Sequence, residues 1–423
     1  MTEKESLNKS LYLSTVTKDG PLKTLFKAFK AGTDSYGFDK TFITGVTPVV
    51  MSDITSGYNI ADNIYNDKQF NGLCGFYADD VRSVLEQVYR LCNITDDSLD
   101  NMMLLIEKYF DGHKFSPYAE ENVYNPTLVL YFLKKLLFSC EPPRDMLDDN
   151  MAVDYQKIEY ISNLSNGKEI VFDLSENGFK TELSRIQQRF GIKNLLSDDS
   201  KDKQFILSYL YYVGSLTVFG ETDSGFISLQ IPNLVMKNLY MDRIKFMLFP
   251  EPQNRDIGID AAKILHTQGD IAPLCEFVEN NALKVFSNRD YAWANELTIK
   301  TMFLALTYND ILYIMDSEKE IRRSYMDLTM IIRPDKRHFK IFDILFEFKY
   351  VSLKTAKLTG NKAKSLSKKQ LRDLPCIKEA MKEAKKQARA YSKKLNAKYR
   401  NLKLKTFAIV CLGFDRIYWK EVL

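Results

Sequence analysis

The sequence predicts an α/β protein of several domains, whose last unit follows the order α-β-β-β-α-β with one more short strand. Three observations support this class. The chain has 423 residues, which is enough for two or three domains. Residues 79–140 are mainly helical in pattern, whereas residues 286–423 alternate apolar strands with amphipathic helices. Residues 345–350 (Leu-Phe-Glu-Phe-Lys-Tyr) have the alternation of a buried strand but carry two charges on one face.

The first predicted unit covers residues 1–145. It opens with a short helix at residues 22–29 and an apolar strand at residues 41–46, and continues as helices from residue 79 to residue 140. Glu-Pro-Pro-Arg at residues 141–144 interrupts the helical pattern and marks the boundary.

The second predicted unit covers residues 146–285 and has an α+β pattern. A helix from residue 204 to about residue 214 precedes two short strands, at residues 215–219 and 226–230, which form a hairpin. A helix followed by a hairpin is compatible with a winged-helix arrangement. Such a unit can contact DNA or can act as a packing connector, and both interpretations stay open.

The third predicted unit covers residues 286–423. Its predicted helices are at residues 290–307 and 376–397, and its predicted strands are at residues 311–315, 325–332, 339–350, 406–411 and 416–419. The two strands at residues 325–350 form a hairpin around Arg-Pro-Asp-Lys.

The hairpin of the third unit carries the most informative charges of the chain. Glu347 and Lys349 share one face of the second strand because side chains alternate along a strand. A turn centred near residue 336 or 337 places Asp327 opposite residue 345 or 347, so Asp327 and Glu347 share a face in either register. Two adjacent carboxylates repel each other unless a cation lies between them, and Mg²⁺ or Mn²⁺ prefers such oxygen ligands. Lys349 is placed to orient water or to stabilise charge on a phosphate.

Glu296 is the charged member of an apolar stripe on the helix before this sheet. A buried carboxylate requires a partner. The metal site is one candidate partner, and an ion pair with a lysine or arginine at the rim is the other.

The last long helix combines a packed stripe with a basic exposed face. Gln387 and Tyr391 are four residues apart and therefore neighbours on the helix surface. Between Lys349 and Lys405 the chain holds 19 basic and 3 acidic residues, whereas the remainder holds 40 basic and 52 acidic residues. This asymmetry is compatible with polyanion binding or with a solvated helix. The predicted nucleic-acid contacts are Lys385, Lys386, Arg389, Tyr391 and Lys393.

Asp327 followed by Glu347-Phe-Lys349, within this order of elements, resembles the PD-(D/E)XK nuclease superfamily and its restriction-endonuclease-like fold. The resemblance implies metal-dependent phosphodiester hydrolysis, with Asp327 and Glu347 as metal ligands, Glu296 as a supporting ligand and Lys349 as the catalytic lysine. Gln387 and Tyr391 resemble the fourth motif of the superfamily, which gives Gln387 a catalytic role. The sequence departs from related nucleases before the aspartate, where it reads Arg323-Ser-Tyr-Met instead of containing Gly-Arg.

The rest of the chain resembles the later part of an AAA-ATPase-like domain that often precedes this nuclease. The resemblance rests on short runs such as Thr-Phe-Ile-Thr-Gly-Val-Thr-Pro at residues 41–48 and Tyr-Phe-Asp-Gly-His-Lys-Phe at residues 109–115. The chain has no G-x-x-x-x-G-K-[ST] loop, so we expect a truncated ATPase remnant without its own ATPase activity. The edge of the strand at residues 41–46 is then a predicted contact for a protein partner or for self-association.

Composition excludes several other classes. The six cysteines form no C-x-x-C pair and the three histidines are scattered, which disfavours a zinc site and predicts reduced thiols in a cytoplasmic protein. The polar N-terminus and the absence of a long apolar run predict no signal peptide and no membrane partner. We therefore expect a nuclease that uses Mg²⁺ or Mn²⁺ and acts on nucleic acid, with DNA favoured over RNA. The alternatives are a catalytically inactive binding or regulatory protein and an ATP-binding protein completed by another chain.

Overall fold

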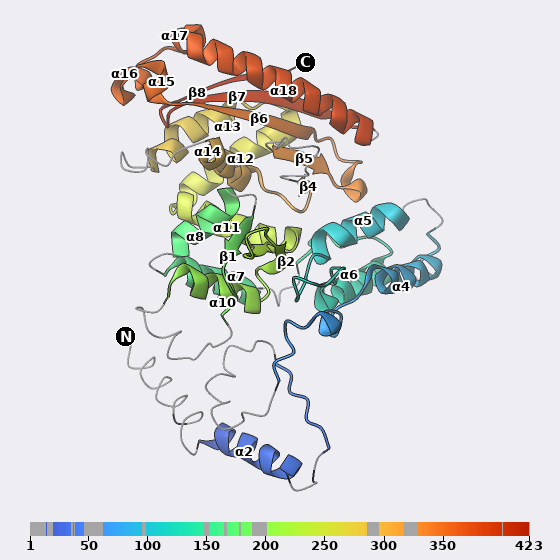
Figure 1. Ribbon diagram of the computed structural model, residues 1–423. Helices are drawn as coiled ribbons and strands as arrows, with labels where there is room; N and C mark the ends of the chain where they lie inside the picture. Colours follow the sequence, from blue (N-terminus) through green and yellow to red (C-terminus); the bar gives the residue numbers. More distant parts are fainter. Residues whose placement is uncertain are drawn as a thin grey trace.

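The computed structural model describes residues 20–34, 37, 39–45, 62–94, 99–147, 152–164, 167–176, 179–187, 201–285, 296–316, 328–399 and 401–422, together with residue 14. Figure 1 shows a helical unit that contains α4, α5 and α6, an α+β unit, and a C-terminal unit in which the long helix α18 lies over a sheet.

The helical unit packs three helices around one apolar cluster. The helix α2 (Pro21–Asp34) and the short turn η3 (Lys68–Phe70) come before this unit in the chain. The three helices of the unit are α4 (Ala78–Leu91), α5 (Leu99–Phe110) and α6 (Pro126–Ser139). Each helix contributes fully buried side chains, among them Leu85, Ile106 and Phe132, to the same cluster. The helical pattern predicted for residues 79–140 is therefore confirmed.

The strand predicted at residues 41–46 is wrong for the residues that are described. Residues 41–45 have no regular secondary structure and are exposed, with Phe42 at 65% exposure, and residue 46 lies outside the described residues. A strand requires a neighbour for its backbone hydrogen bonds, and no described strand pairs with this segment. The sheet edge that was to bind a partner is thus not present in the described part of the chain.

One pair of cysteines contradicts the expectation of reduced thiols. Cys92, at the C-terminal end of α4, forms a disulfide with Cys140, at the C-terminal end of α6. Their Cα atoms are 5.5 Å apart, which is within the range that a disulfide requires. Sequence spacing did not reveal the pair because 48 residues separate the two cysteines and only the packing of α4 against α6 brings them together. With this disulfide present, the cysteines no longer support a cytoplasmic location.

We expect thiol titration of the unreduced, denatured protein to detect four free cysteines, Cys74, Cys275, Cys376 and Cys411, and six after reduction. Cys92→Ser should lower the free energy of unfolding by about 2–4 kcal/mol under oxidising conditions, since the cross-link restricts the unfolded chain. The same substitution under reducing conditions should have a much smaller effect. Six reactive thiols before reduction would contradict the disulfide.

The α+β unit contains the predicted helix and hairpin together with one further strand. Its elements are α7 (Ala152–Ser162), α8 (Gly167–Glu176), β1 (Lys180–Leu183), α10 (Lys203–Tyr212), β2 (Thr217–Glu221), β3 (Ile227–Gln230) and α11 (Leu234–Leu248). The predicted pairing of β2 with β3 is confirmed, and β1 adds to β3, giving the order β1-β3-β2. The winged-helix interpretation stays a prediction. The helical connector that follows comprises α12 (Pro252–Gln268), α13 (Ala272–Phe277), η6 (Val278–Ala282) and η7 (Leu283–Val285).

The C-terminal unit has the predicted order of elements. Its elements are α14 (Glu296–Thr307), β4 (Tyr313–Asp316), β5 (Leu328–Ile332), η9 (Pro334–Lys336), β6 (Asp343–Val351), α15 (Leu353–Ala356), α16 (Gly360–Lys364), α17 (Lys368–Asp373), α18 (Pro375–Lys398), β7 (Leu404–Leu412) and β8 (Arg416–Glu421). The sheet order is β4-β5-β6-β7-β8. The β6–β7 pair is parallel, as the long connection through α18 requires, and the other pairs are antiparallel.

Helices cover both faces of this sheet (Figure 1). Phe346 and Phe348 of β6 meet Phe303 of α14 on one face, with ring centroids 6.0 and 5.1 Å apart. Leu345 packs with Tyr391 of α18 on the other face. The even-numbered residues of β6 thus face α14, and the odd-numbered residues face α18.

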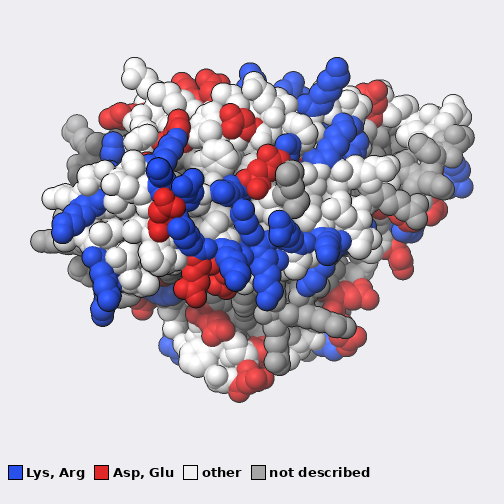
Figure 2. All heavy atoms as spheres, turned by 90° about the horizontal axis from the view of Figure 1, so that it is seen from above, with Lys and Arg blue, Asp and Glu red and all other residues white. Residues whose placement is uncertain are grey.

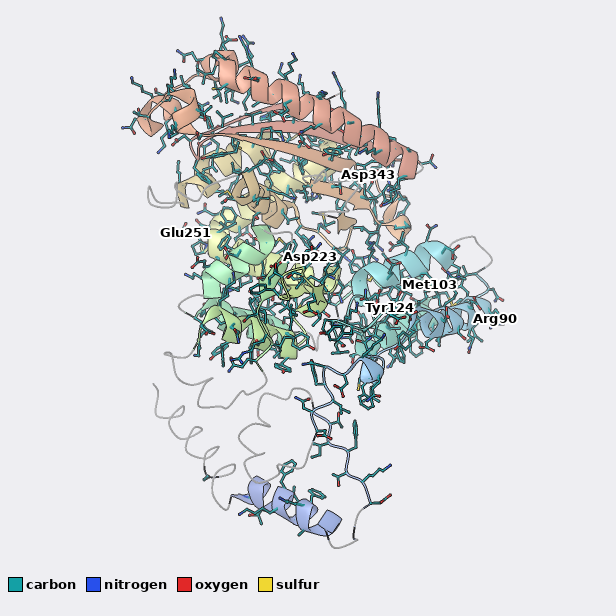
Figure 3. The ribbon with its side chains drawn as sticks, viewed as in Figure 1. Arg90, Met103, Tyr124, Asp223, Glu251 and Asp343 are labelled. Carbon is teal, nitrogen blue, oxygen red and sulfur yellow. A yellow bond between two sulfur atoms is a disulfide. The ribbon has the colours of Figure 1, made fainter. Side chains whose placement is uncertain are left out.

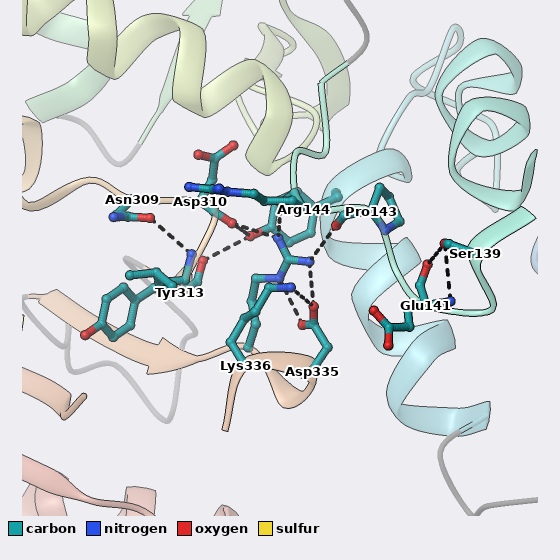
Figure 4. A network of polar contacts seen from close by, with 12 residues as sticks. Ser139, Glu141, Pro143, Arg144, Asn309, Asp310, Tyr313, Asp335 and Lys336 are labelled. Atoms are coloured by element: carbon teal, nitrogen blue, oxygen red, sulfur yellow. Dashed lines mark hydrogen bonds and ion pairs between the residues drawn. The ribbon is translucent and has the colours of Figure 1, made fainter. Parts of the chain in front are cut away.

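Arg333, which follows β5, joins the C-terminal unit to the helical unit. Figure 4 shows this network, with Pro143, Arg144, Asp310 and Asp335 labelled. Its guanidinium is fully buried and donates to the two carboxylate oxygens of Asp335, at 3.1 and 3.0 Å. It also donates to the backbone carbonyls of Pro143, Arg144 and Asp310, at 3.3, 3.3 and 3.2 Å. A buried charge is tolerated only when it is paired and hydrogen-bonded in this way. The loop after α6 is therefore fastened to the turn of the β5–β6 hairpin.

Candidate active site

The centre of the candidate site is β6, where two charged side chains interrupt an apolar strand. Glu347 is buried, with 2% of its side chain exposed, and Lys349 is exposed by 18%. Both are odd-numbered and therefore lie on the α18 face of the sheet. The alternation predicted from the sequence is confirmed for these two residues.

A third charge comes from the start of α14. Nζ of Lys349 is 3.2 Å from Oε1 of Glu347 and 3.8 Å from Oε1 of Glu296. Exposure increases from Glu347 through Lys349 to Glu296, whose side chain is 35% exposed. The cluster therefore runs from the buried strand to the surface, where a ligand can reach it. Glu296 forms the ion pair with a lysine that was one of its two predicted arrangements.

The position of Asp327 lies outside the described residues, but the register of its hairpin is described. Leu328 pairs with Phe346, and Met330 pairs with Ile344. This register corresponds to a turn centred at residue 337, one of the two centres predicted from the sequence. The ladder ends at Leu328, one residue after Asp327.

Asp343, labelled in Figure 3, holds this register and was not identified from the sequence. Its side chain is fully buried at the start of β6. Oδ1 accepts a hydrogen bond from the backbone N–H of Ile332 at 2.9 Å, and Oδ2 accepts from the backbone N–H of Lys403 at 2.8 Å. Oδ2 also accepts from Nη1 of Arg337 at 2.6 Å. One carboxylate thus connects β5, the hairpin turn and the segment that enters β7. The sequence signal that could have identified Asp343 was an acidic residue at the start of a predicted buried strand.

Gln387 and Tyr391 lie on α18 but differ in their surroundings. Tyr391 is 7% exposed and packs with Ile331 and Leu345. Gln387 is partly exposed, and its Nε2 donates to Oε1 of Glu383 at 3.4 Å. The structure does not bring Gln387 into hydrogen-bonding contact with the described charged cluster. The buried ring of Tyr391 packs α18 on the sheet, and its contact with nucleic acid stays a prediction, as do those of the basic side chains.

A family model of the PD-(D/E)XK nuclease superfamily matches residues 294–421. The C-terminal domain belongs to the PD-(D/E)XK nuclease superfamily. The match contains Glu296, the β5–β6 hairpin with Glu347 and Lys349, and α18. A search of curated proteins and a search of solved structures found no match. The AAA-ATPase-like resemblance of the earlier residues stays a prediction.

Members of this nuclease superfamily generally use divalent metal ions to act on nucleic acid. Within the described residues, no group of three histidine, cysteine or acidic side chains is arranged to hold a metal ion. The charged cluster of Glu347, Lys349 and Glu296 nevertheless supplies two carboxylates within 4 Å of the same ammonium group. Carboxylate oxygens are the ligands that a hard divalent cation prefers, so the donor set fits such an ion.

The cysteine nearest in register to the charged cluster of Glu347, Lys349 and Glu296 is not a nucleophile. Cys411 of β7 pairs with Tyr350 of β6 and is fully buried. Burial raises the pKa of the Cys411 thiol well above its usual value, and the nearby charges of Glu279 and Glu296 raise it further. A protonated, buried thiol is inert. Cysteine chemistry is therefore excluded at this position.

Basic side chains cover the outer surface of α18 in the C-terminal domain. Figure 2, which looks onto the top of the view in Figure 1, shows lysines and arginines gathered on this side of the molecule. Lys386, Arg389 and Lys393 are exposed, and Lys385 is partly exposed. A separate feature concerns membranes: none of the helices in the described segments combines the length and the hydropathy that a bilayer crossing requires.

Proposed function

We propose that the C-terminal domain hydrolyses phosphodiester bonds of nucleic acid with a bound divalent cation, Mg²⁺ or Mn²⁺. The observation that carries the proposal is the buried carboxylate of Glu347 beside the ammonium of Lys349, 3.2 Å away, on the sheet face covered by a basic helix. Burying a carboxylate is unfavourable unless it has a use or a partner, and here it opens toward solvent through Lys349 and Glu296.

Glu347 and Asp327 are the proposed metal ligands, and Glu296 is the proposed supporting ligand. The β5–β6 register supports this set, because one further residue in the same register would pair Asp327 with Glu347. The bound cation would supply Lewis acidity and would lower the pKa of a coordinated water.

Lys349 has the proposed task of stabilising negative charge on the phosphate and orienting the attacking water. Its ammonium is held between two carboxylates, 3.8 Å from Glu296 and 3.2 Å from Glu347, which limits its motion. A fixed positive charge in a partly dry site stabilises a developing phosphate charge more than a mobile one in water. Gln387, which is partly exposed on α18, is proposed to assist Lys349 in catalysis.

Affinity would come from the basic side chains of α18 and of the segment that contains α15, α16 and α17. Lysine and arginine contacts to phosphates release counterions and give binding without sequence preference. The proposal therefore includes a nucleic-acid partner but no base specificity from these contacts.

The test incubates the full chain with single- and double-stranded DNA and RNA in Mg²⁺, Mn²⁺ or EDTA. We expect cleavage in the presence of metal, none in EDTA, and loss of cleavage in both Asp327→Ala and Lys349→Ala. Glu379→Ala, which removes an exposed carboxylate of α18, is the matched control and should cleave normally. Nucleic-acid binding without cleavage by the unmodified protein in every metal would contradict the proposal and favour an inactive binding protein.

A further inference from the structure

The long helix α18 rests on the sheet through small side chains. Ala384 and Ala388 of α18 and Ala408 of β7 are fully buried in one apolar cluster. Because alanine side chains are short, the helix backbone lies close to the sheet. The two flanks of α18 are therefore brought near the strands on either side of this contact.

The strand registers place a lysine in line with the charged cluster. Glu347 of β6 pairs with Ala408 of β7, and Ala408 pairs with Lys420 of β8. Paired residues point to the same face of a sheet, and Tyr418 of β8 packs in the cluster beneath α18. Lys420, two residues further along β8, is thus on the α18 face. Two strand spacings separate the backbones of Glu347 and Lys420 by about 10 Å.

Three cations gather on the β8 side of α18. Lys385 and Arg389 are one turn apart on the helix. Lys420 pairs with Ala408 of β7, which packs in one cluster with Ala384 and Ala388 of α18, so the strand brings Lys420 toward the flank of the helix that carries Lys385 and Arg389. In agreement with this placement, the pKa of Lys385 is lowered, first by burial and then by the positive charges of Lys420 and Arg389. An α-helix turns about 100° per residue, so Gln387, two residues after Lys385, lies about 200° around the helix from it. Gln387 is therefore on the opposite flank of α18, toward β6.

No carboxylate of the described chain forms an ion pair with this trio. Two acids of neighbouring segments pair elsewhere: Asp373 with Lys378 at 3.3 Å, and Glu421 with Lys405 at 2.6 Å. Glu383 interacts with Gln387 on the other flank of α18. Three like charges without an acid repel one another, and a bound anion relieves that repulsion.

We infer that Lys385, Arg389 and Lys420 bind the phosphates of one strand of a DNA duplex while the Glu347–Lys349 cluster engages the other strand. The inference rests on the proposed function and names its substrate class. In this arrangement α18 lies in the major groove, with the exposed Lys382, Lys386 and Lys393 on the side away from the sheet.

The dimensions of α18 match those of the groove. A helix with its side chains is about 10–12 Å across, and the major groove of B-form DNA is about 12 Å wide. Its 24 residues extend for about 36 Å, which is close to one turn of a duplex. The deep and narrow major groove of an RNA duplex does not admit a helix, so double-stranded DNA is selected over double-stranded RNA.

The test measures binding of a fluorescent 20-base-pair DNA duplex by anisotropy as a function of salt. The full chain carries Glu347→Gln, so that the duplex stays intact. The test variant adds Lys385→Gln and Lys420→Gln, and the matched control adds Lys168→Gln and Lys263→Gln, two exposed lysines of α8 and α12. We expect the test variant to bind the duplex about tenfold more weakly, with a log–log salt slope smaller by about 2. The control should keep both the affinity and the slope of its parent.

Single-stranded DNA, an RNA duplex of the same sequence and inorganic phosphate complete the design. We expect the two substitutions to weaken the binding of duplex DNA more than the binding of single-stranded DNA. We also expect the parent protein to bind duplex DNA more tightly than duplex RNA. Equal losses for single and double strands, unchanged duplex binding, or equal affinity for both duplexes would each overturn the inference. If millimolar phosphate displaces the duplex from the control but not from the test variant, the three cations form a site for free phosphate. That result would also overturn the inference. Because no step requires turnover, a protein that fails to cleave still gives a clear result here.

Discussion

Glu347→Gln is expected to reduce metal-dependent cleavage at least 100-fold while leaving the protein folded. The amide has nearly the same size as the carboxylate but lacks its charge, so it is a poor ligand for a divalent cation. A loss of several kcal/mol of transition-state stabilisation corresponds to a rate loss of this order. Lys349 retains its contact with Glu296, at 3.8 Å, so the ammonium is not left alone in the cluster.

The measurement for Glu347→Gln is the single-turnover rate at saturating metal, together with Mn²⁺ binding followed by calorimetry. We expect weaker Mn²⁺ binding and a melting temperature within a few degrees of the unmodified protein. Glu379→Gln on the exposed surface of α18 provides the control and should change neither quantity. Cleavage within about threefold of the unmodified rate would remove Glu347 from the metal site.

Asp343→Asn should lower the free energy of unfolding by about 2–3 kcal/mol, because a fully buried carboxylate loses hydrogen bonds from backbone N–H groups and its ion pair with the partly exposed Arg337. Asp343 accepts from the backbone N–H groups of Ile332 and Lys403 and from Arg337, with both oxygens in use. Asparagine replaces one of these acceptors with an NH₂ group that faces a donor. The substitution also loosens the register between β5 and β6, so cleavage should decrease along with stability.

Urea unfolding measures this effect, with the amplitude and slope of the transition as checks on two-state behaviour. Asp373→Asn is the matched control, because its carboxylate is 44% exposed and its ion pairs are at the surface. We expect the control to stay within about 0.5 kcal/mol of the unmodified protein. A loss below 1 kcal/mol for Asp343→Asn would show that other contacts hold the hairpin register.

The charged cluster could be anticipated from the sequence because its rules are local. Side-chain alternation places Glu347 and Lys349 on one face of any strand that contains them, and the turn residues limit the register to two choices. The apolar stripe before the sheet likewise identified Glu296 as an anomalous charge. These features depend on neighbours within a few residues or across one hairpin, so a single sequence contains the required information.

Other features depend on contacts between distant segments and were missed for that reason. The disulfide between Cys92 and Cys140 requires the packing of α4 on α6. The buried contacts of Arg333 reach carbonyls nearly 190 residues away in sequence. Lys420 is aligned with Glu347 only through the intervening strand β7. The strand predicted at residues 41–46 is the reverse case, a feature that was predicted but is not found in the described residues. Its apolar composition favours a strand but does not supply a neighbouring strand to pair with.

The sequence alone determined which side chains of the last unit carry charge on a buried strand, the order of its helices and strands, and its membership in the nuclease superfamily. The tertiary structure decided which of two registers the hairpin adopts, which flank of α18 faces β8, and that Lys349 lies between Glu347 and Glu296. The physical reason is that strand periodicity is a property of the backbone, whereas register and helix orientation are set by packing and by buried hydrogen bonds such as those of Asp343.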